Sequence, residues 1–223
     1  MGVLSLIKQE VNIVFERDPA AYSKAQVFFL YPGVRAIINY RIAHWLDGRG
    51  HRFLADWVSK RTRKKTGIEI HPSAKIGKGV FIDHGMGVVI GETAEVGDYC
   101  TIYQGVTLGG TGKDKGKRHP TIGKNVTIGS GAKILGPFTV GDNSKVAANA
   151  VVLNEIPPNS TCVGVPAHIV KRDNKRVAHA APTIRPVADL DQIHIPDPVS
   201  MEICSLRAEI DHLKKKLEEK ENE

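Results

Sequence analysis

The chain has 223 residues and is 41% hydrophobic, so it can bury a sizeable core, and no run in it is long and apolar enough to span a membrane. Its formal net charge of +7 is compatible with nucleic acid, but aromatic residues are only 6% of the chain and leave little basis for base stacking. Three scattered cysteines and an N-terminus without a signal-peptide pattern predict a cytoplasmic protein. We expect its basic groups to bind a small anionic ligand, and we expect neither nucleic acid nor a membrane as partner.

Residues 1–66 are predicted to form a helical segment. Asp18 and Pro19 have the pattern of a helix cap followed by proline at the first helical position. Pro32 and Gly33 break the pattern, and apolar residues then recur at helical spacing until Gly48. Another helix is expected to run to the basic stretch 60–65.

Residues 67–171 repeat with a period of six, which is the period of neither a helix nor a single strand. The aliphatic positions are Ile70, Ile76, Ile82, Val88, Ile90, Val96, Ile102, Leu108, Ile122, Ile128, Ile134, Val140, Val146 and Val152. Four positions after many of them stands a second small or apolar residue: Ala74, Val80, Ala94, Cys100, Val106, Val126, Ala132, Ser144 or Ala150. This hexapeptide repeat predicts a parallel β-helix in which three short strands make one triangular coil. The fold class is therefore mainly β with helical appendages.

Two breaks interrupt the repeat, and loops that project from a solenoid usually carry its function. Between Ile82 and Ile90 the step is eight residues, and the extra residues lie beside Asp83 and His84. Between Leu108 and Ile122 the step is fourteen, and the glycine-rich insertion 109–120 carries Arg118 and His119 near its end. We expect the chemistry at these breaks.

The C-terminal part has a different composition. Residues 172–200, rich in Pro, His and Arg, are expected to be a linker, and residues 201–223 a short amphipathic helix. Its apolar residues alternate steps of three and four, as in a coiled coil: Ile203, Leu206, Ile210, Leu213 and Leu217. This spacing predicts a small parallel three-helix bundle, and the alternative is one helix docked on its own subunit.

Several motifs carry a resemblance that runs in order from about Asp18 to Lys171. They are Asp83-His84, Gly91-Glu-Thr-Ala94, Gln104-Gly-Val-Thr-Leu-Gly-Gly-Thr-Gly112, Arg118-His-Pro120 and Gly164-Val-Pro-Ala167. In these motifs the chain resembles serine O-acetyltransferases, which are left-handed β-helices that assemble as homotrimers, or as dimers of trimers, with active sites between neighbouring subunits. The resemblance implies transfer of acetyl from acetyl-CoA to the hydroxyl of L-serine, the first step of cysteine biosynthesis from serine.

The resemblance also assigns roles to residues. It implies that His84 is the general base, a role that imidazole fills near neutral pH. The family orients this histidine with an upstream Asp, and this chain has Glu69 at that position. Asp83 and Asp18 match carboxylates that hold the substrate, and Arg118 and His119 match the groups that face its carboxylate. Asp18 has an equally good interpretation as a helix cap.

Acetyl-CoA is expected as a co-substrate, with no permanently bound cofactor and no metal. Its site is predicted from the family pattern and the glycine-rich loop, in which Gly110 is the candidate oxyanion donor. The residues are Gly110, Thr111, Ser130, Gly131, Gly164, Ala167 and Lys171. Many family members bind O-acetylserine sulfhydrylase through a C-terminal Ile; this chain ends in charged residues, so we expect no such complex.

Three alternatives remain at this stage. A related acetyltransferase that acts on a sugar or xenobiotic hydroxyl has the same fold and co-substrate. A γ-type carbonic anhydrase uses the same solenoid with three histidine zinc ligands, but His71, His84 and His119 are too irregularly spaced to match that set. A non-catalytic scaffold would not need two breaks with paired charged residues.

Overall fold

The structure, a computed structural model, describes residues 3–112, 115–173, 175–176, 206 and 210. The chain divides into residues 1–178 and residues 179–223. The predicted linker, residues 172–200, begins in the first unit, and its start is wrong: residues 171–172 and 175–176 pair as antiparallel strands. The rest of the linker lies outside the described residues. In the second unit the described residues are Leu206 and Ile210, both helical and exposed, so the predicted C-terminal helix and three-helix bundle also lie almost entirely outside the described residues. No helix in the described part of the chain is long and apolar enough to cross a membrane.

The first unit begins with helices: α1 (Val3–Arg17), α2 (Lys24–Leu30), α3 (Pro32–Gly48) and α4 (Arg52–Thr66). Pro32 breaks the helical pattern as predicted, and it does so at the first position of α3, where a missing N–H costs nothing. The prediction that Asp18 caps a helix is wrong. Asp18 follows α1 and accepts a hydrogen bond from the Ala20 N–H in a local turn, while Ser23 caps α2 through a 3.1 Å bond from the Gln26 N–H.

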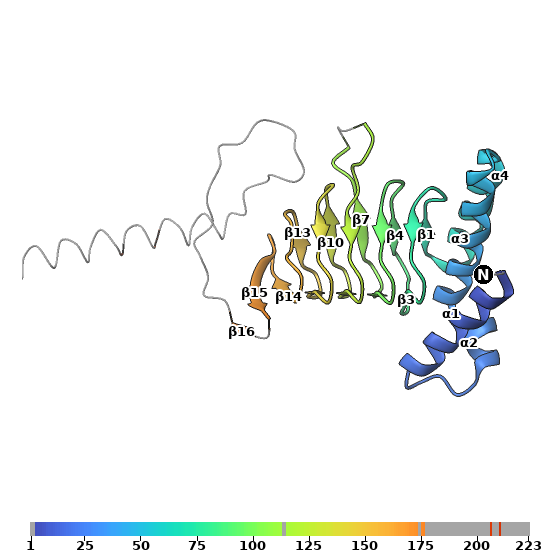
Figure 1. Cartoon of the computed structure of the whole chain (residues 1–223), viewed down its shortest axis with the longest axis horizontal. Coiled ribbons are helices and arrows are strands. Elements are labelled where there is room, and N and C mark those ends of the chain that lie inside the picture. Colours follow the sequence, from blue (N-terminus) through green and yellow to red (C-terminus); the bar gives the residue numbers. More distant parts are fainter. Residues whose placement is uncertain (1–2, 113–114, 174, 177–205, 207–209, 211–223) are drawn as a thin grey trace, which may run out of the picture. The chain divides into compact units, whose positions relative to one another are not determined.

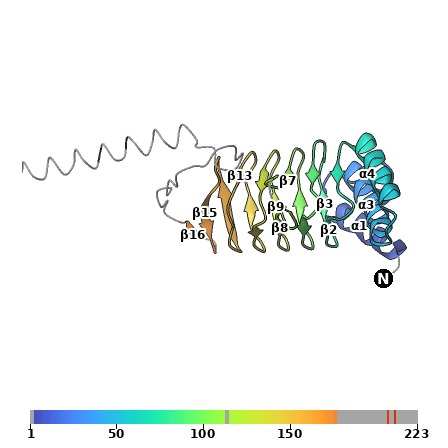
Figure 2. The same ribbon diagram turned by 90° about the horizontal axis from the view of Figure 1, so that it is seen from above.

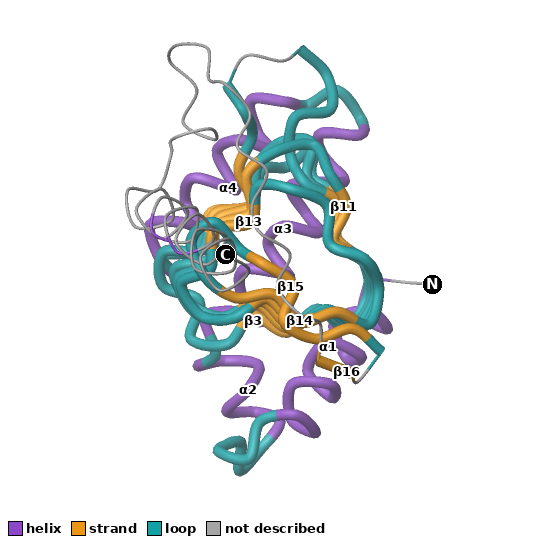
Figure 3. The backbone as a smooth tube through the Cα atoms, turned by 90° about the vertical axis from the view of Figure 1, so that its left-hand side faces the viewer, coloured by secondary structure: helices purple, strands orange, loops and turns teal. Residues whose placement is uncertain are grey.

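A stack of short parallel strands follows the helices (Figures 1 and 2). The first sheet contains β1 (Glu69–Ile70), β4 (Val89–Ile90), β7 (Thr107–Gly109), β10 (Lys133–Leu135) and β13 (Val151–Val152). The second contains β2 (Lys75–Ile76), β5 (Glu95–Val96), β8 (Thr121–Ile122) and β11 (Thr139–Val140). The third contains β3 (Phe81–Ile82), β6 (Thr101–Ile102), β9 (Thr127–Ile128), β12 (Lys145–Val146), β14 (Ser160–Val163), β15 (His168–Arg172) and β16 (Lys175–Arg176). Successive strands therefore pass from sheet to sheet, and three of them make one coil, seen end-on in Figure 3.

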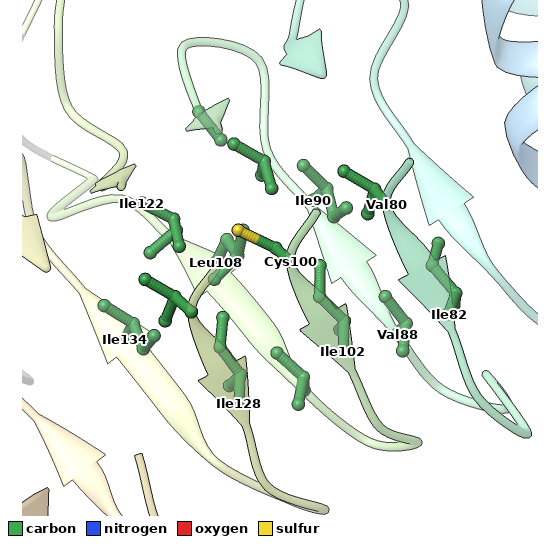
Figure 4. Packing of buried hydrophobic residues seen from close by; sticks show 14 of the residues in the cluster. Val80, Ile82, Val88, Ile90, Cys100, Ile102, Leu108, Ile122, Ile128 and Ile134 are labelled. Carbon is green, nitrogen blue, oxygen red and sulfur yellow. The ribbon is translucent and has the colours of Figure 1, made fainter. Parts of the chain in front are cut away.

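The two sets of repeat residues fill the interior of this prism, as predicted (Figure 4). The repeat aliphatics are each at most 7% exposed, and burying each such side chain stabilises the fold by roughly 1.5–3 kcal/mol relative to exposure. The second set of repeat residues, which stand directly before strands, is also buried, and Cys100 is one of them. Val88 belongs to this second set rather than to the first, because it precedes β4 and its carbonyl accepts the Glu69 N–H, as the Ala94 carbonyl accepts the Lys75 N–H.

The turns between sheets stack into three edges, and two of them carry the breaks. The His84 edge, as we call it, consists of the turns from the third sheet to the first: residues 83–88, 103–106, 129–132 and 147–150. The loop edge consists of the turns from the first sheet to the second: residues 71–74, 91–94, 110–120 and 136–138. The short break lies on the His84 edge and the long insertion on the loop edge, where it projects beside β7 in Figure 1.

Both ends of the coil stack are covered. At the start, Ile37 and Tyr40 of α3 join the core, and the Tyr40 hydroxyl donates to the Ala74 carbonyl. At the far end, β15 turns back and pairs antiparallel with β14, whereas β12 and β14 pair in parallel. A second apolar cluster, described below, fixes the helices to β3.

Candidate active site

Asp83 and His84 lie in the first turn of the His84 edge, directly after β3. His84 has a φ of 56°, a left-handed conformation that is uncommon for a residue with a side chain. Its side chain is 75% exposed, and its Nε2 lies 3.9 Å from Asp83 Oδ1. The turn therefore holds an accessible imidazole at the edge of the prism, with a carboxylate beside it.

The helices bring a second carboxylate to this region. Asp18 Oδ2 accepts a hydrogen bond from the Tyr31 hydroxyl at 2.6 Å. Burial, that hydrogen bond, and the negative charges of Asp18 and Asp83 raise the pKa of Tyr31 to about 12. Both carboxylates therefore act on the Tyr31 hydroxyl, Asp18 by direct contact, and Asp83 is the residue before His84.

Arg118 and His119 lie at the root of the insertion, folded back on the preceding coil. The Thr93 hydroxyl accepts the backbone N–H of Arg118 at 3.0 Å and that of His119 at 3.1 Å. The Arg118 guanidinium pairs with the Glu92 carboxylate. Glu92 and Thr93 thus fix the end of the loop in position and keep a cation at the loop edge.

His119 is held more tightly than Arg118. Its Nδ1 lies 3.2 Å from the Thr93 N–H and 2.9 Å from the Thr93 hydroxyl, so Nδ1 accepts and the proton belongs on Nε2. Burial first, and then the charge of Arg118, lower the pKa of His119. The ring packs on Gly91, where a Cβ would overlap it, and close to Gly110. His119 is therefore a neutral N–H donor that faces a glycine-lined surface.

The structure does not bring the two breaks of one chain together. His84 and the Arg118–His119 pair lie at the two ends of the first sheet, on different edges of the prism. One side of the triangle takes about six residues, which span roughly 20 Å in extended conformation. A ligand as small as an amino acid cannot contact both edges of the same chain.

Glu69 begins β1, directly after the turn on which the His84 turn stacks, since the Gly87 N–H donates to the Gly67 carbonyl at 2.9 Å. Its carboxylate is paired with two cations of α4, Lys60 at 2.9 Å and Arg63 at 3.0 Å. A carboxylate has about four lone-pair sites, so an imidazole donor is possible only in addition to these partners.

Most of the residues predicted for CoA lie on the same two edges. Ser130 and Gly131 lie in the His84 edge, and the Ser130 carbonyl accepts the Asn149 N–H of the next coil at 2.8 Å. Gly164 and Ala167 continue that edge, where the Gly164 carbonyl accepts the Val151 N–H and the Ala167 N–H donates to the Val151 carbonyl. Gly110 and Thr111 lie on the loop edge, and Lys171 lies in β15 and is exposed.

Sequence reasoning missed Tyr31, Glu92 and Thr93 as parts of the site. Glu92 and Thr93 stand inside a recognised motif, so their position was a usable signal. Tyr31 had none, because only the folding of α2 and α3 onto β3 brings its hydroxyl to Asp18. Within the described residues, no group of three or more His, Cys, Asp or Glu side chains is arranged to hold a metal ion.

A parallel β-helix built from hexapeptides, with an accessible histidine on one edge and a glycine-rich loop on another, defines the class of hexapeptide acyltransferases. The family model described as bacterial transferase hexapeptide (six repeats) matches residues 119–154. Serine acetyltransferases match over nearly the whole chain: that of Staphylococcus xylosus is 50% identical over 93% of this chain and 92% of its own length, and that of Bacillus subtilis is 49% identical over 96% and 95%.

Solved structures agree with these relatives. The crystal structure of Neisseria gonorrhoeae serine acetyltransferase has a TM-score of 0.75 at 41% identity and covers 78% of this chain and 67% of that one. The Brucella abortus enzyme in complex with coenzyme A has a TM-score of 0.74 at 44% identity and covers 76% and 68%. The chain belongs to the serine acetyltransferase family, and its coils form a left-handed parallel β-helix, as predicted.

Proposed function

We propose that the protein transfers the acetyl group of acetyl-CoA to the hydroxyl of L-serine, giving O-acetyl-L-serine and CoA. The observation that carries this proposal is the charge pattern of the two edges. The acidic pair Asp18 and Asp83 suits the ammonium group of an amino acid, and Arg118 with the His119 N–H suits its carboxylate. A sugar hydroxyl offers neither charge, which favours serine as acceptor.

His84 is the proposed general base. Its exposed imidazole accepts the proton of the serine hydroxyl while the oxygen attacks the thioester carbonyl, so no acyl-enzyme forms. The new C–O bond forms a tetrahedral intermediate, whose collapse breaks the C–S bond and returns the proton to the CoA sulfur. The Gly110 N–H is the proposed donor to the oxyanion. Glu69 is the proposed partner that orients His84, sharing its carboxylate with Lys60 and Arg63.

Acetyl-CoA is proposed to lie along the His84 edge. Neighbouring coils are about 4.8 Å apart, so Ser130 and Gly131 lie roughly 10 Å from the His84 turn and Gly164 and Ala167 roughly 19 Å from it. Lys171 is close to the far end of this path and offers a cation to a phosphate. This arrangement leaves the acetyl end of the molecule at His84.

The separation of the two edges supports a homotrimer in which the loop edge of one subunit faces the His84 edge of the next. Each site then draws its acidic pair and base from one subunit, and Arg118, His119, Gly110 and Thr111 from its neighbour. The mass in sedimentation distinguishes a trimer from a dimer of trimers. The unpaired cysteines Cys100 and Cys162 fit the reducing, cytoplasmic location that we propose.

A complementation experiment tests the shared site. His84→Ala and Arg118→Ala are each expected to be nearly inactive alone. When the two variants are unfolded together and reassembled, one site in about four combines a native His84 edge with a native loop edge, so about a quarter of wild-type activity returns. No recovery from trimers of mixed composition would show that each site lies within one subunit.

The activity itself is tested by measuring free thiol released from acetyl-CoA in the presence of different acceptors. L-serine is expected to stimulate release, while a sugar hydroxyl and a xenobiotic acceptor are not. Release stimulated by a sugar and unchanged by L-serine would identify the protein as an acetyltransferase of the other kind.

A further inference from the structure

The Asp18 carboxylate is oriented by two hydrogen bonds, one to each oxygen. Oδ1 accepts the Ala20 N–H at 2.8 Å, and Oδ2 accepts the Tyr31 hydroxyl at 2.6 Å. The first bond lies within the local turn after α1 and does not depend on how the helices pack. The second joins residues thirteen apart in sequence and so depends on how α2 and α3 pack.

Tyr31 is itself fixed relative to the His84 turn. It is the residue between α2 and α3, and it packs against an apolar cluster of Val11, Val14, Val27, Val34 and Phe81. Phe81 lies in β3, two residues before Asp83. Gly33 rests directly on the same strand, since a Cβ there would overlap the Ile82 carbonyl. The cluster therefore links the Tyr31 backbone to the strand that carries Asp83 and His84.

The turn after α1, which carries Asp18, is also bonded to the β-helix through Arg17. Arg17, the residue before Asp18, donates to the Tyr99 carbonyl at 3.1 Å and to the Thr101 hydroxyl at 3.3 Å. Thr101 begins β6, the strand beside β3. The position of Asp18 is thus fixed in two ways. The side chain of the preceding residue, Arg17, bonds to Thr101 of the third sheet, and the Asp18 carboxylate bonds to Tyr31, which packs on Phe81 of the same sheet.

We propose that Tyr31 is a positioning residue for L-serine: its hydroxyl fixes the Asp18 carboxylate beside Asp83, at the place where the substrate ammonium binds. This inference rests on the function proposed above. A hydroxyl donor differs from a lysine or arginine partner in that it orients a carboxylate without bringing a positive charge to it. The Asp18 carboxylate is therefore oriented by an uncharged partner and remains available to pair with the incoming ammonium. With a pKa raised to about 12, the hydroxyl stays protonated and remains a donor throughout the working pH range.

Tyr31→Phe tests the proposal, because it removes the hydroxyl and retains the ring in its apolar cluster. Losing a hydrogen bond to a charged group at a partly exposed site is expected to raise the KM for L-serine about five- to twenty-fold. The turnover number should change less than about twofold and the KM for acetyl-CoA should not change, since the lost interaction is equal in ground and transition states. Tyr22→Phe, which removes an exposed hydroxyl from the same turn, is the matched control and should behave as wild type.

Asp18→Asn provides the second arm. If Tyr31 acts through Asp18, Tyr31→Phe raises the KM for L-serine no further in an Asp18→Asn background. An unchanged KM in Tyr31→Phe, an equal rise in the Asn background, or a parallel loss of acetyl-CoA affinity and thermal stability would each overturn the proposal. A wild-type protein that releases no CoA with L-serine would instead refute the proposed function, so the two failures are distinguishable.

Discussion

Replacing Gly91 by alanine tests whether the His119 ring packs as closely against residue 91 as the structure indicates. A Cβ at this position would overlap the imidazole, and even the third-nearest ring atom, Cε1, would lie only 2.9 Å away. The ring cannot move freely, because it is 8% exposed and its Nδ1 is bonded to Thr93. A shift of about 1 Å at a substrate-positioning group costs about 10²-fold in rate, and overpacking costs about 1–3 kcal/mol of stability.

The assay is the rate of CoA release with saturating acetyl-CoA and L-serine, measured alongside thermal unfolding. Gly48→Ala makes the same chemical change where a Cβ meets nothing within 4 Å, and it should leave the rate unchanged. In a His119→Ala background the clash is absent, so Gly91→Ala should add little further loss. Wild-type activity in Gly91→Ala, or a full additional loss in the His119→Ala background, would refute the contact as the cause.

Other substitutions and conditions test separate parts of the structure. His84→Ala should lower turnover by about two to four orders of magnitude while acetyl-CoA still binds, and near-normal turnover would exclude it as the base. Glu69→Gln should reduce turnover and also weaken the ion pairs to α4; a loss of stability with unchanged turnover would leave Glu69 a structural residue. Because the pKa of His119 is lowered in the folded state, the unfolded chain binds more protons just below its ordinary value of 6.5; stability is therefore full above that pH and falls below it, and His119→Gln should flatten this part of the stability profile. Cys100 and Cys162 are buried with pKa values raised to about 11, so neither should react with iodoacetamide in the native protein at pH 8, and rapid labelling of either would contradict the packing.

The repeat could be read from the sequence because packing inside a narrow prism leaves little choice of residue. Each coil needs three inward aliphatics, and the six-residue step is unaffected by what lies outside. The error at Val88 has a physical origin. The extra residues between Ile82 and Ile90 occupy a turn, and an aliphatic at the end of that turn fits the second, small-residue position as well as it fits the first.

The positions of the two breaks on the prism could be predicted by counting strands in threes, but they are not evident from the six-residue period alone. Three steps make a coil, so Ile90 and Leu108, eighteen residues apart, stand on the same sheet. One break precedes the first of these strands and the other follows the second, which puts them on opposite ends of that sheet. The two breaks can therefore form one site only if they come from different subunits, or if the chain had a different fold.

Asp18 shows where sequence reasoning reaches its limit. An Asp-Pro pair is an equally good signal for a helix cap and for a turn, and the local chain does not decide between them. The outcome depends on Tyr31, whose hydroxyl reaches Asp18 only after α2 and α3 have packed on Phe81. Contacts of this kind join elements by tertiary packing and leave no periodic trace.

The antiparallel return of β15 has a consequence for the solubility of the protein. A stack of parallel coils presents at each end a row of unpaired backbone groups, and such a template invites a further copy to add on, as in an amyloid fibril. Here β15 runs against the direction of the strands it covers, and at the other end α3 covers the first coil with Tyr40. In the third sheet the parallel pairing therefore ends at β14, so a further copy could not extend that sheet in the register of the coils.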